Sequence, residues 1–170
     1  MLEPYNYTFD PDTNYYTFIT KNNIEYKVAF FQDFMLESCT TADIKLGNVF
    51  QITVEKSTDK PSGLDACVSE TIRAIVVAFF QNVDNALIYI CDDDDEKGQV
   101  RFNAFERWYL NSTMTDCITK INNVVEIELD DDSILKIHTS IMFHNNNTNS
   151  ENIKITYNSI SQFFTGDFLN

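Results

Sequence analysis

The sequence predicts an α+β fold, with a largely antiparallel sheet of about seven strands and about three helices packed on it. Apolar and polar residues alternate in the first and last thirds of the chain, which is the period of half-buried strands. Three other segments space their apolar residues as helices do. The chain has 170 residues, 44% of them apolar, which is enough for one hydrophobic core, so we expect a single domain over residues 1–170.

The first third of the chain is predicted to form strands. Aromatic and apolar residues alternate over residues 5–9, 16–20, 24–30 and 48–55. Asn22 and Asn23 separate the second and third of these runs, and asparagine tolerates the positive φ that a two-residue hairpin turn requires. A connection over 32–47, with at most one helical turn, precedes the fourth run. These segments indicate an antiparallel meander.

The middle of the chain changes its period. Apolar residues of 64–82 fall at helical spacing, and Ser62 or Asp65 can cap the first turn. The run 87–91 is continuously apolar, which predicts a strand that is covered on both faces. A second helix is expected over 97–110, with a buried stripe of Val100, Ala104, Phe105 and Trp108.

The last third returns to strands. Apolar residues alternate over 125–129 and 135–143, on either side of an acidic turn, which predicts a second hairpin. A final helix is expected over 150–164, because four apolar residues fall on one stripe: Ile153, Tyr157, Ile160 and Phe164.

The chain is strongly acidic, with 26 Asp and Glu against 12 Lys and Arg and a formal net charge of −14. This charge repels the phosphates of nucleic acids and anionic membrane surfaces, so we expect neither as a partner. An acidic surface attracts basic proteins instead, and it accelerates their capture.

Compartment and enzyme class are constrained mainly by what the sequence lacks. The N-terminus has no signal-peptide pattern, and no apolar run reaches the roughly 18 residues of a membrane helix. No P-loop, GxGxxG, HExxH or GxSxG motif occurs, which argues against a nucleotide enzyme and favours a non-enzymatic role without deciding it. Four scattered cysteines without a CxxC pair are typical of reduced thiols, which predicts a cytoplasmic protein: Cys39, Cys67, Cys91 and Cys117.

Four consecutive aspartates, Asp92 to Asp95, follow the predicted buried strand. Carboxylates at a strand end can hold Mg²⁺ or Ca²⁺, which prefer several oxygen ligands, and Asp92 and Asp95 are the candidates for such a metal site. The loop lacks the alternating ligands, central glycine and distal glutamate of an EF-hand. The alternative is a solvated acidic turn whose last carboxylates lie near the positive N-terminus of the next helix.

Arg101, Arg107 and Tyr109 complete the candidate site. Arg101 can form a fork-shaped pair with Asp92 or Asp95 that holds the loop against the helix. Alternatively, the two arginines contact an anion or a partner. Tyr109 can reach the surface. The sequence therefore leaves open whether these residues form a structural junction or a binding surface.

The two histidines are expected to face solvent. His138 and His144 share the parity of Lys136 on the predicted strand, opposite the face of Ile137 and Ile141. They lie six residues apart, about 20 Å along an extended strand, so they cannot share one metal ion. We predict a solvated face with no catalytic triad.

A pattern of residues runs from the first strands into the second helix: Tyr7-x-Phe9, Tyr16-x-Phe18-x-Thr20, Tyr26-x-Val28-x-Phe30, Tyr89-Ile90-Cys91-Asp92, Asp95, Arg101, Phe105, Arg107 and Trp108. This pattern resembles an uncharacterised family of small acidic bacterial domains, mainly from Bacteroidota, that carries a domain-of-unknown-function label. The chain departs from the family pattern at Glu96, Lys97 and Phe102. The resemblance implies a fold but no catalytic residues.

Three functions follow as expectations from these observations. The first is a non-enzymatic acidic protein-binding module that docks a basic partner, as an immunity protein, an antitoxin or a defence-accessory protein would. The second is a divalent-metal-dependent enzyme that uses Asp92 to Asp95. The third is a structural or oligomeric subunit.

Overall fold

The computed structural model describes residues 2–40, 44–58, 65–91, 97–128 and 134–161, and it confirms the predicted α+β fold. The structure also contains a short 3₁₀ turn, η1, between the third helix and the sixth strand. The elements in chain order are β1 (Tyr7–Asp10), β2 (Tyr15–Ile19), β3 (Glu25–Gln32), α1 (Met35–Ser38), β4 (Val49–Lys56), α2 (Ala66–Phe79), β5 (Ala86–Cys91), α3 (Gly98–Leu110), η1 (Thr113–Asp116), β6 (Ile118–Glu128), β7 (Ile134–His144) and α4 (Ser150–Asn158).

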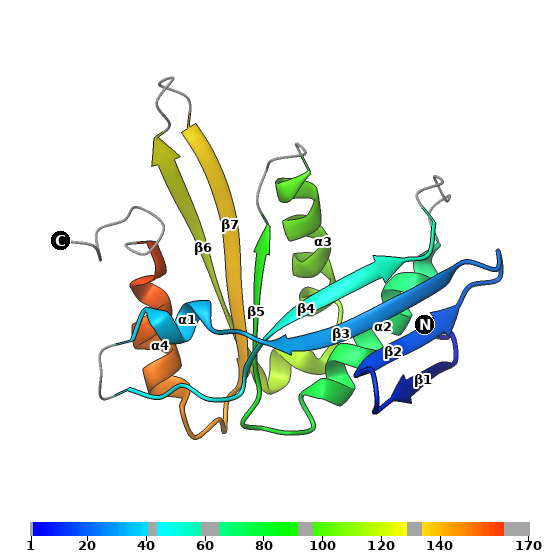
Figure 1. The fold of residues 1–170 in the computed structure, drawn as a ribbon, viewed down its shortest axis with the longest axis horizontal. Coiled ribbons are helices and arrows are strands. Elements are labelled where there is room, and N and C mark those ends of the chain that lie inside the picture. Colours follow the sequence, from blue (N-terminus) through cyan, green and yellow to red (C-terminus); the bar gives the residue numbers. More distant parts are fainter. Residues whose placement is uncertain (1, 41–43, 59–64, 92–96, 129–133, 162–170) are drawn as a thin grey trace.

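The strands form one sheet in the order β1-β2-β3-β4-β5-β7-β6 (Figure 1). Every neighbouring pair is antiparallel except β4 and β5, which run parallel. The β2–β3 hairpin turn contains Asn23 at φ 57°, and the β1–β2 turn contains Asn14 at φ 59°. Asparagine is one of the few residues that adopt this left-handed conformation readily. The predicted meander is confirmed, but the predicted two-residue turn is longer, because the backbone N–H of Thr20 bonds to the carbonyl oxygen of Ile24 and only Asn23 of the asparagine pair has a positive φ.

Helices cover the two faces of the sheet unequally. On one face, α2 packs on the strands β2 to β4 and α3 packs on β5 and β7. On the other face, α1 and α4 cover the part of the sheet around β5 and β7. In Figure 1, α2 lies behind β3 and β4, whereas α1 and α4 lie on the near side, beside β6 and β7. The near face of β2 to β4 therefore carries no helix among the described elements.

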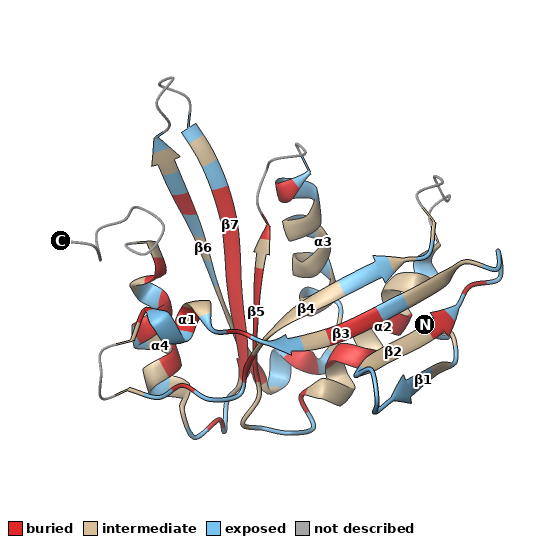
Figure 2. Ribbon diagram, in the orientation of Figure 1, coloured by how far each residue is buried: buried red, intermediate tan, exposed pale blue. Residues whose placement is uncertain are grey.

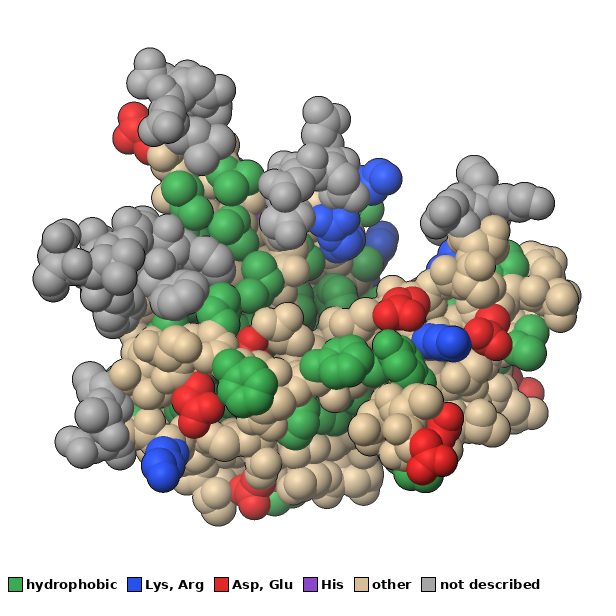
Figure 3. All heavy atoms as spheres, viewed as in Figure 1, with side chains coloured by type: hydrophobic (Ala, Val, Ile, Leu, Met, Phe, Trp, Pro, Cys, Tyr) green, Lys and Arg blue, Asp and Glu red, His purple; other side chains and the backbone are tan. Residues whose placement is uncertain are grey.

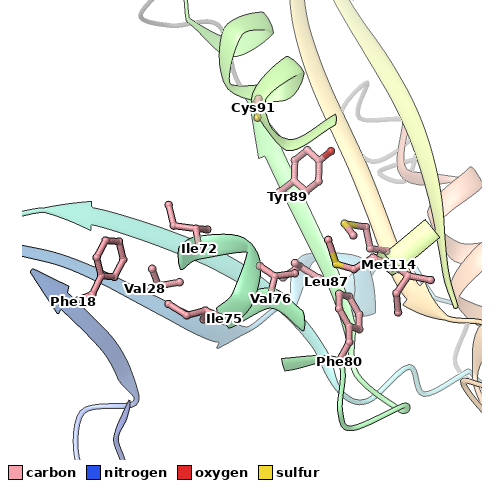
Figure 4. Close-up of a cluster of buried hydrophobic side chains, with 12 residues drawn as sticks. Phe18, Val28, Ile72, Ile75, Val76, Phe80, Leu87, Tyr89, Cys91 and Met114 are labelled. Atoms are coloured by element: carbon pink, nitrogen blue, oxygen red, sulfur yellow. The ribbon is translucent and has the colours of Figure 1, made fainter. Parts of the chain in front are cut away.

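Strand β5 contributes to both hydrophobic cores. Leu87, Tyr89 and Cys91 belong to the core beneath α2 and α3, and they project from the same side of β5 (Figure 4). Ala86 and Ile88 belong to the core beneath α1 and α4. Figure 2 shows β5 and the adjoining length of β7 as the most buried strands of the sheet. The predicted strand covered on both faces is thus confirmed.

The first turn of α2 is capped by Asp65, one of the two capping residues that the sequence predicted. Asp65 is the N-cap residue, and its Oδ1 accepts a hydrogen bond from the backbone N–H of Cys67 at 3.1 Å. Its Oδ2 accepts a second hydrogen bond from the Tyr5 hydroxyl at 2.7 Å. Asp65 therefore links the N-terminal segment to the start of α2, while the other candidate, Ser62, lies outside the described residues.

Two sequence predictions about local structure are wrong. Val100 was expected in the buried stripe of α3, but it is 64% exposed. The predicted Phe105 and Trp108 do pack against the core, together with Phe102 and Tyr109. The larger ring of Phe102 packs on the sheet, which rotates the buried face away from Val100. Strand β6 begins at Ile118 rather than near residue 125, because polar residues on its first half disguise the alternation.

The other outcomes concern the last helix, the cysteines and membrane spans. Ile153, Tyr157 and Ile160 are buried as predicted, whereas Phe164 lies outside the described residues. All four cysteines are free. No helix in the described part of the chain has the length and apolar character needed to cross a membrane.

The buried stripe of α2 provides a test of the fold. Replacing Ile75, which is fully buried, with alanine is expected to lower the free energy of unfolding by about 2–5 kcal/mol through lost burial and a residual cavity. Val100→Ala at an exposed helix position is the control and should stay within about 0.5 kcal/mol of the wild type. Urea denaturation of both variants measures the difference, and equal losses would contradict the assigned core.

Candidate functional site

A row of polar side chains crosses three strands beneath α3. Tyr89 of β5 is paired in register with Ser140 of β7, and Ser140 is paired with Asn122 of β6. Residues in register on neighbouring strands point to the same face. The Ser140 hydroxyl donates to Asn122 Oδ1 at 2.8 Å, and it also lies 3.1 Å from the carbonyl oxygen of Ile121. A side-chain hydrogen bond thus joins Ser140 to Asn122, while Tyr89 belongs to the row by strand register.

An ion pair between a buried lysine and a half-buried glutamate joins this row to α3. The Lys120 ammonium forms an ion pair with the carboxylate of Glu106, and it donates to Asn122 Oδ1 at 2.5 Å. The side chain of Lys120 is only 3% exposed. Its ammonium also lies 5.3–5.8 Å from three ring centroids, those of Phe102, Tyr89 and Tyr109. We call Tyr89, Glu106, Lys120, Asn122 and Ser140 the α3 cluster.

The pKa shifts in the α3 cluster follow from its burial and pairing. Burial acts to raise the pKa of Glu106, but the hydrogen bond and charge of Lys120, together with Asn122, outweigh it and leave this pKa below its usual value. Burial lowers the pKa of Lys120, because Glu106 offsets only part of the desolvation. The pair therefore fixes α3 on the sheet.

Two buried polar atoms beside the α3 cluster have no hydrogen-bond partner among the described residues: the Tyr89 hydroxyl and Nδ1 of His138. Burial strongly raises the pKa of Tyr89, and the nearby Ser140 hydroxyl opposes only part of that shift. The Tyr89 hydroxyl points toward β7 (Figure 4). The Phe102 ring lies over both side chains, 6.1 Å from the Tyr89 ring and 5.2 Å from the His138 ring. Helix α3 therefore shields both groups from water.

The predicted solvent-facing position of His138 is wrong. Its parity is as predicted, because Ile141 and Phe143 pack on the opposite face beneath α4. His138 therefore points to the opposite face of β7 from Ile141. Helix α3 covers that face, so His138 is only 8% exposed. His144, at the end of β7, is half-buried, and its Nδ1 accepts from the backbone N–H of Asn146 at 3.0 Å.

A cavity lies where β4 and β5 separate. The two parallel strands are paired over only three positions, from Val49↔Ala86 to Gln51↔Ile88. Beyond them the strands diverge, as Figure 1 shows, and α3 closes the space between them. The cavity has a volume of about 310 Å³ and is lined by residues of β4, β5 and α3. We call it the β4–β5 cavity.

The structure separates the residues that the sequence grouped into one site. Arg101 lines the β4–β5 cavity, together with Trp108. Arg107 is exposed and lines a different depression beside α2. Tyr109 points into the interface between α3 and the sheet, where its hydroxyl donates to the carbonyl oxygen of Ile118 at 2.8 Å. Its pKa is raised by burial and by the charge of Glu106.

The metal prediction falls outside the described residues. Asp92 and Asp95 are not among them, so the proposed Mg²⁺ or Ca²⁺ site and the pairing of these aspartates with Arg101 stay predictions. Within the described ranges, no group of three or more His, Cys, Asp or Glu side chains is arranged to hold a metal ion.

Sequence reasoning missed Lys120, Glu106 and Gln51. Lys120 lies on the half of β6 that was not recognised as a strand, and a single lysine there carries no signal of burial. Gln51 lines the cavity and donates a hydrogen bond to Asp33, which is 18 residues away in sequence. Such a contact depends on strand register, which no local pattern specifies.

The fold and the buried cluster define a class of α+β domain, in which a mixed seven-stranded sheet is covered by helices on both faces around its central strand. The chain belongs to the family of unknown function DUF6169, which matches residues 64–159. The match runs from the start of α2 to the end of α4, so it contains the α3 cluster and the β5 and α3 walls of the cavity. Neither a curated protein nor a solved structure matches the chain.

The Glu106–Lys120 pair is expected to stabilise the fold far more than a surface pair does. Glu106→Gln leaves the Lys120 charge buried without its partner and should cost about 1.5–3 kcal/mol of unfolding free energy. The control is Glu151→Gln, which removes an exposed pair with Lys154 at 2.8 Å and should cost at most about 0.5 kcal/mol. Denaturant titration at neutral pH compares them, and indistinguishable variants would contradict a structural role for the buried pair.

The same pair predicts a pH dependence. The folded-state pKa of Glu106 lies below its unfolded value of about 4.3, so the stabilisation is complete above that value and is lost as pH falls through the folded pKa. The difference in stability between the wild type and Glu106→Gln should therefore shrink below about pH 4. A difference that stays constant from neutral to acidic pH would exclude this linkage.

Proposed function

We propose that the chain is a non-enzymatic protein-binding module that docks a basic partner on the helix-free face of β2 to β4. The observation that carries this proposal is that the described helices cover only one of the two faces of these strands. Phe18 and Val28 pack in the core beneath α2, and the alternate side chains point away from it. We call the members of this second set that reach the surface the open face: Tyr15, Thr17, Ile19, Glu25, Lys27, Phe31, Thr53 and Glu55. Ala29 lies between them and is buried.

The open face has an apolar and aromatic centre. Phe31 is 45% exposed and Ile19 is 54% exposed. The rings of Tyr15 and Phe31 pack edge to face with centroids 6.2 Å apart, and the Tyr15 hydroxyl donates to Glu55 at 3.3 Å. Aromatic side chains that are already held in place lose little entropy on binding, and they supply much of the energy of protein interfaces. This surface therefore supports protein docking.

The charges on the open face favour a basic partner. Glu25 and Glu55 are its two acids, and its one base, Lys27, lies 3.7 Å from Glu25 and 5.9 Å from the centre of the Tyr15 ring. Figure 3 shows the apolar side chains of this side with acidic groups around them. An apolar centre with an acidic rim matches a partner that has an apolar patch bordered by Lys or Arg.

A second copy of the chain fits this surface less well than a basic protein does. Both copies would bring a net charge of −14 and the same acidic rim together, which opposes self-association. A protein that captures a basic partner would act as an immunity protein, an antitoxin or a defence-accessory protein does. The same acidity supports a role without nucleic acid, and four free cysteines support a reducing compartment such as the cytoplasm.

The proposal predicts that partner capture depends on the open face. Purification of the tagged protein from an extract of its native cells should retain a basic protein, and Phe31→Ser should reduce that retention at least tenfold by removing the central ring. Ile155→Ser is the matched control, because Ile155 is 60% exposed on α4, outside the open face. Equal retention by the wild type and Phe31→Ser would overturn this choice of surface.

Salt provides an independent test of the charge argument. Association between oppositely charged surfaces is screened over about 8 Å at physiological ionic strength, so the association rate of the purified pair should fall as salt rises. Glu55→Lys should lower the association rate and flatten its salt dependence. A partner that binds at the same rate at low and high salt would contradict electrostatic docking.

A further inference from the structure

The β4–β5 cavity is a candidate binding site for a small molecule that is distinct from the open face. It lies beyond the last parallel pair, Gln51↔Ile88, at the carboxyl ends of both strands. Ligands of α/β proteins bind preferentially at the carboxyl ends of parallel strands, where the backbones separate and leave room between them. The volume of about 310 Å³ is at the lower end of the range for ligand pockets, which indicates a small ligand.

The walls of the cavity are mostly apolar and aromatic. Ile52 and Val54 of β4 form one side, and Phe105 and Trp108 of α3 form another. The Phe105 and Trp108 rings pack edge to face with centroids 4.9 Å apart, and Phe105 also stacks on Tyr89 at 4.3 Å. These contacts hold the aromatic wall rigidly. A rigid aromatic wall favours a flat, unsaturated ligand.

The polar groups of the cavity favour a negative charge on that ligand. Among the described residues that line the cavity, Arg101 is the one that is charged at neutral pH. Basic side chains gather over α3, beside the hollow between α3 and β4 (Figure 3). A guanidinium has five donors in a planar fork, so it can bind a carboxylate while it keeps another contact.

Gln51 adds a second polar group of fixed position. Its Nε2 donates a hydrogen bond to Asp33, which is buried and also accepts from the backbone N–H of Leu36 at 2.8 Å. This chain of hydrogen bonds orients the amide where β4 enters the cavity. A cavity with a cationic fork, an oriented amide and an aromatic wall has the groups that fix both ends of a ligand.

We propose that the β4–β5 cavity binds a small aromatic carboxylate, with its ring against Trp108 and Phe105 and its carboxylate on Arg101. The carboxylate is favoured because it matches the planar fork of arginine, and the ring is favoured because the remaining walls offer apolar surface. This site does not depend on the docking role of the open face, because Arg101, Phe105 and Trp108 lie on α3. Only Gln51, at the rim of the cavity, is in register with a residue of the open face, Phe31.

Trp108 is the only tryptophan in the chain, so its fluorescence reports on this cavity directly. The full-length protein is titrated with 3-phenylpropanoate and with its uncharged analogue 3-phenylpropanamide, with excitation where neither probe absorbs. We expect a saturable change in Trp108 emission with the carboxylate and at least tenfold weaker binding of the amide. The absence of a saturable response at millimolar 3-phenylpropanoate would overturn the proposal.

Three variants locate the site. Arg101→Gln should bring the two probes to equal affinity, whereas Arg107→Gln, on the exposed side of the same helix, should keep the tenfold preference for the carboxylate. Ala104→Leu fills the cavity from α3 and should weaken both probes, so it tests the site even if Arg101→Gln fails to fold. The assignment would be refuted if Arg101→Gln kept the preference for the carboxylate, or if Arg107→Gln lost it equally. Undiminished binding of both probes by Ala104→Leu would refute it as well. Thermal unfolding of each variant confirms that it is folded.

Discussion

The structure depends on strand β5, which is buried on both faces. A strand of this kind needs an apolar layer on each side, and the chain supplies α2 and α3 on one side and α1 and α4 on the other. The same strand joins two differently built halves of the sheet, because it is parallel to β4 and antiparallel to β7. Both cores, and the positions of all four helices, follow from this requirement.

The divergence of β4 from β5 produces the features with functional potential. With only three parallel pairs, the backbone groups beyond Gln51 and Ile88 lose their neighbour, and α3 occupies the resulting space. Helix α3 therefore packs on β5 and β7 at the edge of this gap. The Glu106–Lys120 pair and the aromatic contacts of Phe102 and Phe105 supply that attachment from inside the interface.

Charge is distributed differently inside and outside the molecule. The sequence carries 26 acidic against 12 basic residues, and such an excess of negative charge opposes the approach of polyanions. The β4–β5 cavity has a positive group in its lining, and the α3 cluster balances one positive charge with one negative charge in a region of low dielectric. The net charge of the sequence therefore bears on encounters with macromolecules. It does not determine the charge of a ligand that the β4–β5 cavity can bind.

The sequence by itself determined the class of fold, because periodicity is a local property. Alternation specified the β2–β3 meander and the second hairpin, continuous apolarity specified β5, and helical spacing specified α2 and α4 within a few residues. Only the tertiary structure decided which face of each element is covered. His138 has the parity of a solvent-facing residue and is nevertheless buried, since α3 lies over that face. Lys120 and Gln51 acquired their roles in the same way, because strand register brings together residues that are far apart in the sequence.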